Sequence, residues 1–190
     1  MPPNYTYVNS PDFINNLSFD YVETYSFQRG DEYERNLEIL QAEYDKLKAS
    51  KEYRKTLTTD EERRYDELHR VVGFTQYLND EQGQFHPSGR KTNTFPCEHP
   101  AVERLKRILQ TDVVEIPRRL CSPLYRDAFV FYHWDGGIVS ALNVCLSCQY
   151  METKSFAHIN GDYKTYDLLK IFFLDIGHDV EDPQTGHNLF

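Results

Sequence analysis

The chain has 190 residues, of which 21 are basic and 30 are acidic, giving a net charge of -9. This length favours one domain that buries roughly 70% of its unfolded surface, so its core needs no disulfide or metal. With 39% hydrophobic residues, the composition excludes a disordered, collagenous or membrane-spanning protein, and the negative charge argues against a nucleic-acid partner. We expect one domain with a mainly helical half over 1–95, an α+β half over 96–177 and a polar tail over 178–190.

The N-terminal residues have neither the basic stretch nor the apolar stretch of a secretory signal peptide. The most apolar run, Leu168 to Leu174, is interrupted by Lys170 and is far shorter than the ~20 residues that cross a bilayer. These features predict a cytoplasmic protein with no membrane partner. In that compartment its four cysteines would stay reduced: Cys97, Cys121, Cys145 and Cys148.

Aromatic residues are frequent in the first 28 positions. From Phe19 to Phe27, every second residue is Phe, Tyr, Glu, Tyr and Phe in turn, and this period of two indicates a strand. Tyr21 and Tyr25 are also four residues apart, which is the spacing of one helix face. A helix is therefore the alternative for this segment.

Two helices are predicted next, over residues 31–50 and about 60–78. The first begins with acidic residues and ends with lysines, which suits the helix dipole. At the start of the second, Thr59 and Glu62 have the spacing of a capping box. A linker of about ten residues would let the two helices lie antiparallel as an αα-hairpin.

Residues 79–96 contain two glycines and two prolines among polar residues and are predicted to be a loop. A third helix is predicted over 100–110. Pro100 lies in its first turn, where the missing amide costs nothing.

The apolar pattern then changes to a period of two. It predicts a short strand over 113–116, stopped by Pro117, and two longer strands over 128–133 and 138–148. Between the longer strands, Asp135-Gly136-Gly137 supplies the positive-φ positions of a hairpin turn.

A last helix is predicted over 163–176, with Gly177 as its C-cap. The order of these elements predicts an α+β fold. In it, a helical N-terminal half with an αα-hairpin packs on a small antiparallel sheet that is followed by a C-terminal helix.

Cys145 and Cys148 form a Cys-x-x-Cys motif. Such thiolates can bind zinc, and Cys97 with His99, or Cys121, would complete four ligands. In an extended strand, however, Cys145 and Cys148 point to opposite faces, which favours a second interpretation, a core Cys148 and a half-exposed Cys145 without a metal. A redox dithiol is the third interpretation, although such a motif usually begins a helix.

The segment from Glu103 to Arg126 reverses the charge balance, because its six basic and three acidic residues give +3. A basic strip on an acidic body can bind a carboxylate, a phosphate or an acidic partner. Its candidate binding residues are Arg104, Arg107, Arg118 and Arg119. The alternative is that these arginines pair with the protein's own acidic helices.

The chain has 14 tyrosines, nine of them before residue 78. Tyrosine offers rigid contact area with a hydroxyl group and is enriched at protein interfaces, although tyrosines also close small cores. The aromatic candidates for binding are Tyr21, Tyr25 and Trp134. The acidic stretch that starts at Asp175 and includes His178 lacks the spacing of a calcium-binding loop, so a solvated chain end is expected there.

Residues 113–150 resemble a pattern of small bacterial proteins. In this sequence the pattern is Arg118-Arg119, an apolar strand that ends in Phe131-Tyr132, an Asp135-Gly136 turn and a strand that ends in Cys145-Leu-Ser-Cys148. The resemblance covers about a fifth of the chain. It implies no particular activity, but it favours a role for the cysteines.

The sequence lacks the phosphate-binding, dinucleotide-binding, zinc-protease and serine-hydrolase motifs. The predicted function is therefore that of a non-enzymatic acidic protein that binds a basic protein, as an immunity or inhibitor protein does against a toxin or nuclease. One alternative is a zinc or thiol-redox module at the Cys-x-x-Cys motif. Another is a small enzyme that acts on an anionic substrate. Zinc is the one cofactor considered, and the sequence leaves the oligomeric state open.

Overall fold

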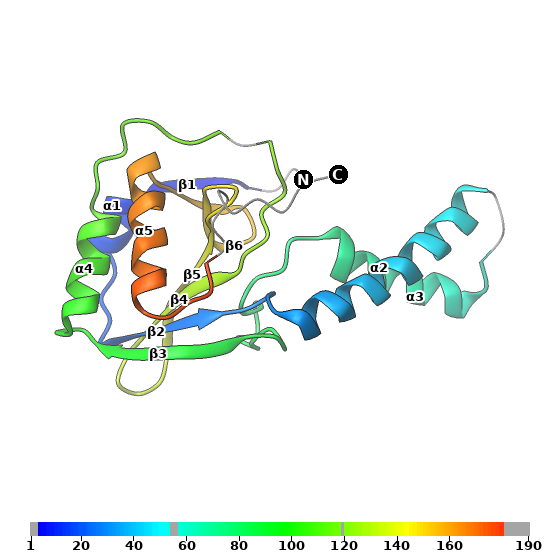
Figure 1. Cartoon of the computed structure of the whole chain (residues 1–190), viewed down its shortest axis with the longest axis horizontal. Helices are drawn as coiled ribbons and strands as arrows, with labels where there is room; N and C mark the ends of the chain where they lie inside the picture. The colour runs from blue at the N-terminus through cyan, green and yellow to red at the C-terminus, as the bar shows by residue number, and fades with distance from the viewer. Residues whose placement is uncertain (1–3, 54–56, 119, 181–190) are drawn as a thin grey trace. The chain divides into compact units, whose positions relative to one another are not determined.

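The computed structural model describes residues 4–53, 57–118 and 120–180. The chain divides into two compact units: a helical unit, Gln28–Gln76, and a sheet unit formed by the chain up to Phe27 and from Tyr77 onward. The protein is α+β, with five helices and a seven-stranded mixed sheet among the described residues (Figure 1). No helix in this part of the chain is long and apolar enough to span a membrane.

In the helical unit, α2 (Asp31–Glu52) and α3 (Thr59–Gly73) form the predicted αα-hairpin. The capping box at the start of α3 joins Thr58 and Glu61, one residue earlier than predicted. The Oγ1 of Thr58 accepts a hydrogen bond from the Glu61 amide at 3.3 Å, and a Glu61 carboxylate oxygen accepts one from the Thr58 amide at 2.8 Å. This exchange satisfies amides that the first helical turn leaves unpaired.

Stacked aromatic rings and an ion pair connect the two helices of the hairpin. The Tyr44 ring of α2 stacks on the rings of Tyr65 and His69 of α3. The Arg64 guanidinium donates two hydrogen bonds, of 2.8 and 2.7 Å, to the Glu43 carboxylate. Because these contacts link residues about twenty positions apart, they fix the hairpin rather than either helix alone.

The sheet of the second unit is larger than the small sheet that the sequence predicted. In spatial order its strands are β1 (Thr6–Asn9), β7 (Ala157–Asn160), β6 (Tyr150–Lys154), β5 (Ile138–Cys145), β4 (Asp127–Tyr132), β2 (Tyr21–Ser26) and β3 (Arg90–Pro96). The β1–β7 pair is parallel and every other neighbouring pair is antiparallel. The sheet is therefore mixed, and part of it comes from the half of the chain that was predicted to be mainly helical.

The hairpin of β4 and β5 is confirmed. All six residues of β4 are buried, as expected for a central strand. The turn between the strands contains Gly136 with a φ of 84°, which a glycine adopts without the strain of a Cβ atom. The predicted strand at 19–27 is confirmed as β2.

Three helices cover one face of this sheet: α1 (Ser10–Asn15), α4 (Pro100–Leu109) and α5 (Tyr163–Asp175) (Figure 1). The predicted helices at 100–110 and 163–176 are thus confirmed, and Gly177 follows α5 with a φ of 87°. The core on this side combines apolar residues of the helices and the strands: Phe13, Val102, Leu105, Leu109, Phe129, Phe131, Leu142, Leu169, Phe172 and Phe173.

The opposite face of the sheet is rich in tyrosine and in buried polar groups. Its apolar cluster includes Tyr25, Tyr125 and Tyr132 together with Cys145 and Cys148. Four buried polar or charged side chains lie on this same face of the sheet: Glu23, Asn143, Glu152 and His158. This face is where the structure gathers titratable groups.

Two predicted elements are wrong. Residues 113–116 form no strand, because the amides of Val114 and Glu115 donate to the Asp162 side chain instead of to a neighbouring strand. Residues 79–96 are not all loop, since β3 occupies their last seven positions. The polar sequence of β3 suits an edge strand that is largely exposed.

We expected the Cys-x-x-Cys motif to continue the strand, but it does not. Strand β5 ends at Cys145 and residues 146–149 form a turn, in which the Gln149 amide donates to the Leu146 carbonyl at 3.3 Å. As a result Cys145 and Cys148 belong to the same buried cluster rather than to opposite faces.

Candidate functional site: a histidine pocket next to a buried carboxylate

A pocket of about 470 Å³ lies over β1, β6 and β7 in the sheet unit. Its wall is completed by the segment between α4 and β4, residues 110–126, which we call the connecting segment. The residues that line this histidine pocket are Tyr7, Ile116, Pro117, Arg118, Gln149, Tyr150, Met151, His158, Ile159, Asn160 and Tyr166. The wall thus combines apolar side chains and rings with one guanidinium, one imidazole and two amides.

Glu152 lies beside this pocket and is held by two phenols. One of its carboxylate oxygens, Oε2, accepts hydrogen bonds from the Tyr77 hydroxyl at 2.5 Å and from the Tyr125 hydroxyl at 2.8 Å. Its backbone carbonyl accepts a third from the Asn143 amide group at 3.1 Å. Because its side chain is only 5% exposed, the two phenols replace water around the carboxylate.

The phenols that hold Glu152 are kept protonated by the same arrangement. Burial raises the pKa of Tyr125, and the negative charge of Glu152 and its hydrogen bond raise it further. Burial and the hydrogen bond to Glu152 raise the pKa of Tyr77 in the same way. Both phenols are therefore donors at any physiological pH.

The other oxygen of Glu152, Oε1, lies 2.7 Å from Nδ1 of His158. The two residues are cross-strand partners on β6 and β7, which explains how they meet. This contact occupies Nδ1, whereas Nε2 of His158 makes no hydrogen bond although the side chain is only 8% exposed. A buried imidazole with an unused nitrogen on a pocket wall can accept or donate a hydrogen bond to a ligand.

Aromatic rings surround the imidazole of His158. The Tyr7 and Tyr5 rings stack on it with centroids 4.9 and 5.6 Å away, and the Tyr150 ring meets it edge-on at 5.1 Å. These contacts fix the ring plane, so that the imidazole is held in one orientation against the pocket.

Arg118 reaches the pocket because the connecting segment is anchored on both sides of it. On one side the carboxylate of Asp162 accepts hydrogen bonds from the Val114 amide at 3.1 Å and the Glu115 amide at 2.9 Å. On the other side a disulfide joins Cys121 to Cys148, in the turn after β5. The backbone between these two anchors carries Ile116, Pro117 and Arg118 along the pocket.

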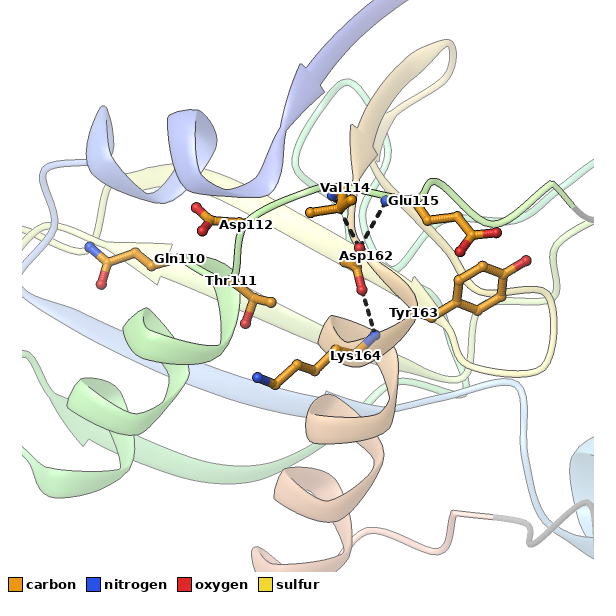
Figure 2. A pocket seen from close by; sticks show the side chains of 8 residues that line it. All are labelled: Gln110, Thr111, Asp112, Val114, Glu115, Asp162, Tyr163 and Lys164. Carbon is orange, nitrogen blue, oxygen red and sulfur yellow. Dashed lines mark hydrogen bonds between the residues drawn. The ribbon is translucent and has the colours of Figure 1, made fainter.

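A second hollow lies at the start of α5, and Figure 2 shows its lining residues. Its central side chain is Asp162, which caps α5 through the Lys164 amide and also holds Val114 and Glu115. Hydrogen bonds from the amides of Glu115, Lys164 and Val114 hold the pKa of this carboxyl below its ordinary value. The carboxylate is already occupied, so its role here is to anchor the connecting segment.

Four of the five proposed zinc ligands have other partners. Cys148 is bonded to Cys121, which also differs from the expectation that all four cysteines are reduced. His99 caps α4 by accepting the Ala101 amide at 3.1 Å, and the Cys97 sulfur contacts Lys106 Nζ at 3.3 Å. Cys145 is a buried thiol, and over residues 4–53, 57–118 and 120–180 no three His, Cys, Asp or Glu side chains are grouped as metal ligands.

The arginines of the predicted basic strip lie in different environments. Arg104 forms an ion pair with Asp175 of α5 at 2.7 Å, and Arg107 donates to the Glu103 carbonyl of its own helix. Arg119 lies outside the described residues, and of the three arginines that the structure describes, Arg118 alone lines the histidine pocket.

The three aromatic candidates lie on one face of the sheet. Tyr21 stacks on Tyr132 and on Trp134, which is 68% exposed. Tyr25 donates from its hydroxyl to Glu23 at 2.7 Å, and Glu23 also accepts from Lys91 at 2.9 Å. Burial alone would raise the pKa of Glu23, but the hydrogen bonds from Lys91 and Tyr25 outweigh it and hold the pKa below its ordinary value.

A second buried histidine was missed by the sequence analysis. His178 was expected in a solvated tail, but its Nδ1 lies 2.7 Å from Asp127 and its Nε2 lies 2.7 Å from the Thr92 hydroxyl. This order of groups resembles a base between an acid and a nucleophile. The Thr92 hydroxyl, however, is also 2.6 Å from the Thr24 hydroxyl and donates to the Thr24 carbonyl at 2.9 Å, so it is saturated and the cluster is structural.

Comparisons with known proteins give no further assignment: no family model, curated protein or solved structure matches the chain. The candidate site therefore depends on its own geometry.

Proposed function

We propose that the protein binds a small ligand in the histidine pocket, and that the ligand carries one carboxylate or phosphate group on a flat, largely apolar body. The observation that carries this proposal is the buried His158 imidazole on the pocket wall, whose Nε2 makes no hydrogen bond, in a pocket that also includes Arg118. A volume of about 470 Å³ falls within the range of small-molecule sites.

The chemistry of the wall supports this ligand class. The Arg118 guanidinium can donate two parallel hydrogen bonds to a carboxylate or phosphate. Tyr7, Tyr150 and Tyr166 offer ring surface, and Ile116 with Ile159 offers aliphatic surface, which suits an apolar body. The lining residues include no serine, threonine, cysteine or carboxylate, which favours binding over acyl transfer through a hydroxyl or thiol nucleophile.

The test uses phenylacetate and phenyl phosphate as probes and phenylacetamide as their neutral counterpart. The two anions should shift the imidazole resonances of His158 in NMR titrations, and the amide should not. Arg118→Gln should weaken binding of the anions about tenfold or more, since a charge-assisted hydrogen bond contributes about 1.5–3 kcal/mol. Arg107→Gln, outside the pocket, is the matched control. Equal binding of the three probes, or no change in Arg118→Gln, would contradict the proposal.

A second candidate function is binding of a basic protein, as an immunity or inhibitor protein does. It is favoured by the net charge of -9 and by exposed rings beside the pocket on Tyr5, Tyr7 and Phe156. Such a complex should associate more slowly as the salt concentration rises, because charge steering is screened. An association rate independent of salt would argue against this candidate.

A further inference from the structure

Three of the four cysteines meet at the turn after β5. Cys121, on the connecting segment, is disulfide-bonded to Cys148, and the two Cα atoms lie 6.2 Å apart. Cys145, three residues before Cys148, carries a thiol and is 1% exposed. A thiol next to a disulfide is the arrangement that thiol–disulfide exchange requires.

The turn keeps Cys145 close to Cys148. Cys145 is paired with Tyr150 across the turn, and Cys148 is the third of the four turn residues between them. A Cys145–Cys148 disulfide needs a Cα separation of about 4.4–6.8 Å, and the reversal of the chain at Leu146–Gln149 brings the two residues closer than an extended strand would. Both sulfurs also belong to the same apolar cluster on this face of the sheet.

We propose that Cys145 exchanges with the Cys121–Cys148 disulfide. The Cys145 thiolate attacks Sγ of Cys148, the Cys145–Cys148 bond forms, and the Cys148–Cys121 bond breaks. Cys121 leaves as a thiolate and takes up, through solvent, the proton that Cys145 lost. The number of disulfides and thiols is unchanged, so no oxidant or reductant is needed.

The two forms differ in what holds the connecting segment. In the Cys121–Cys148 form the segment has an anchor on each side of Arg118, at Asp162 and at Cys121. In the Cys145–Cys148 form the anchor at Cys121 is lost. If the histidine pocket binds ligand as proposed, exchange therefore loosens the wall that carries Arg118 and weakens binding.

The exposure of the two thiols makes the forms distinguishable. Cys145 is buried and protected from an alkylating reagent, whereas Cys121 is exposed and reacts once it is released. The full-length oxidised protein is incubated without reductant with N-ethylmaleimide at about pH 8, because the thiolate is the form that attacks a disulfide. Peptide mass spectrometry after an acid quench then identifies the alkylated cysteine and the remaining disulfide.

The expected result is alkylation of Cys121 together with a Cys145–Cys148 disulfide. In Cys145→Ser, Cys121 should be alkylated at least about tenfold more slowly, while Cys97→Ser, which removes the other thiol, should behave like the wild type. Cys145→Ala is a second variant, and circular dichroism establishes that each variant is folded. Overturning results are alkylation of Cys121 at the wild-type rate in both Cys145 variants, or an unmodified Cys121 in the wild type.

The consequence for the pocket is measured separately, as phenylacetate affinity after Cys121 is alkylated. A loss comparable to that of Arg118→Gln supports the link to the pocket, and an unchanged affinity overturns it. If phenylacetate and phenyl phosphate fail to bind even the unmodified protein, the proposed function fails, but the exchange is still decided by the alkylation pattern.

Discussion

Glu152 acquires its role from two phenols and an imidazole that come from three different parts of the sheet unit. Tyr77 precedes β3, Tyr125 precedes β4, and His158 lies on β7. No spacing in the sequence links these positions. A Tyr-x-Glu alternation at residues 150–152 predicts a strand at most, so the carboxylate site could not be predicted before the strands were paired.

Removing the Glu152 carboxylate should strongly destabilise the protein. In Glu152→Ala the hydroxyls of Tyr77 and Tyr125 lose their shared acceptor, and each unsatisfied buried donor costs about 1–3 kcal/mol. We expect the free energy of unfolding in urea to fall by about 3 kcal/mol. Glu152→Gln, which retains an oxygen acceptor, should cost less than half of that.

Glu103→Ala is the control for this series. Glu103 is also paired with a basic residue, Lys106, but its side chain is 58% exposed. Exposed ion pairs contribute little to the free energy of unfolding. Equal destabilisation by Glu103→Ala and Glu152→Ala would contradict the role assigned to the buried carboxylate.

The helices and strands that the sequence predicted correctly are those whose formation depends on residues close together in the chain. The helices α2, α4 and α5 and the β4–β5 hairpin follow from apolar periodicity, capping residues and the glycines of one turn. The short strands β1, β6 and β7 were missed because each has four or five residues and gains its pairing from distant parts of the chain. The 113–116 segment was wrongly predicted to be a strand. Its Ile116 side chain lines the histidine pocket, and its backbone amides donate to Asp162 instead of to a neighbouring strand.

The cluster of Asp127, His178 and Thr92 fastens the chain after α5 to the sheet. Asp127 lies on β4 and Thr92 on β3, so His178 joins three separate elements. Its side chain is fully buried, and removing one partner of such a pair typically costs about 3–5 kcal/mol. His178→Ala should therefore lower the free energy of unfolding by about 3 kcal/mol, whereas Thr92→Val, which removes one hydroxyl, should cost about 1 kcal/mol.

Hydrogen exchange distinguishes this local role from a general loss of stability. In His178→Ala the amides of β3 and of the last turn of α5 should lose protection first. His133→Ala is the control, because His133 contacts Asp20 at 3.4 Å but is half exposed. Uniform loss of protection over the whole sheet unit would argue against a fastening role.

For the whole molecule, composition predicted a folded chain but not the placement of its tyrosines. The net charge and the tyrosine count favoured a binding surface, and some rings, such as those of Tyr5 and Tyr7, are indeed exposed. Three others, Tyr25, Tyr77 and Tyr125, are buried or half-buried on the tyrosine-rich face of the sheet, where they hydrogen-bond to carboxylates. Which tyrosines are exposed depends on sheet pairing, and a count along the sequence does not contain that information.

The buried tyrosines predict that the protein unfolds cooperatively in alkali. Burial raises the pKa of Tyr132 to about 12, and burial also raises the pKa values of Tyr25, Tyr77, Tyr125 and Tyr166. An unfolded tyrosine has a pKa near 10, so the folded state favours the neutral phenol. The resulting stabilisation is complete below about pH 10 and is lost as the pH rises toward the pKa values of the folded state.

The phenolate absorbance of these residues should therefore rise in the same narrow pH interval in which the circular dichroism of the sheet disappears, above about pH 10. Tyr125→Phe removes one of the buried phenols and should make the alkaline transition less steep, because fewer protons are released on unfolding. Tyr53→Phe, at a side chain that is 82% exposed, should leave the steepness unchanged. If the absorbance instead rises in separate steps while the sheet signal persists, the phenols titrate in the folded protein, and their burial does not resist ionisation as argued.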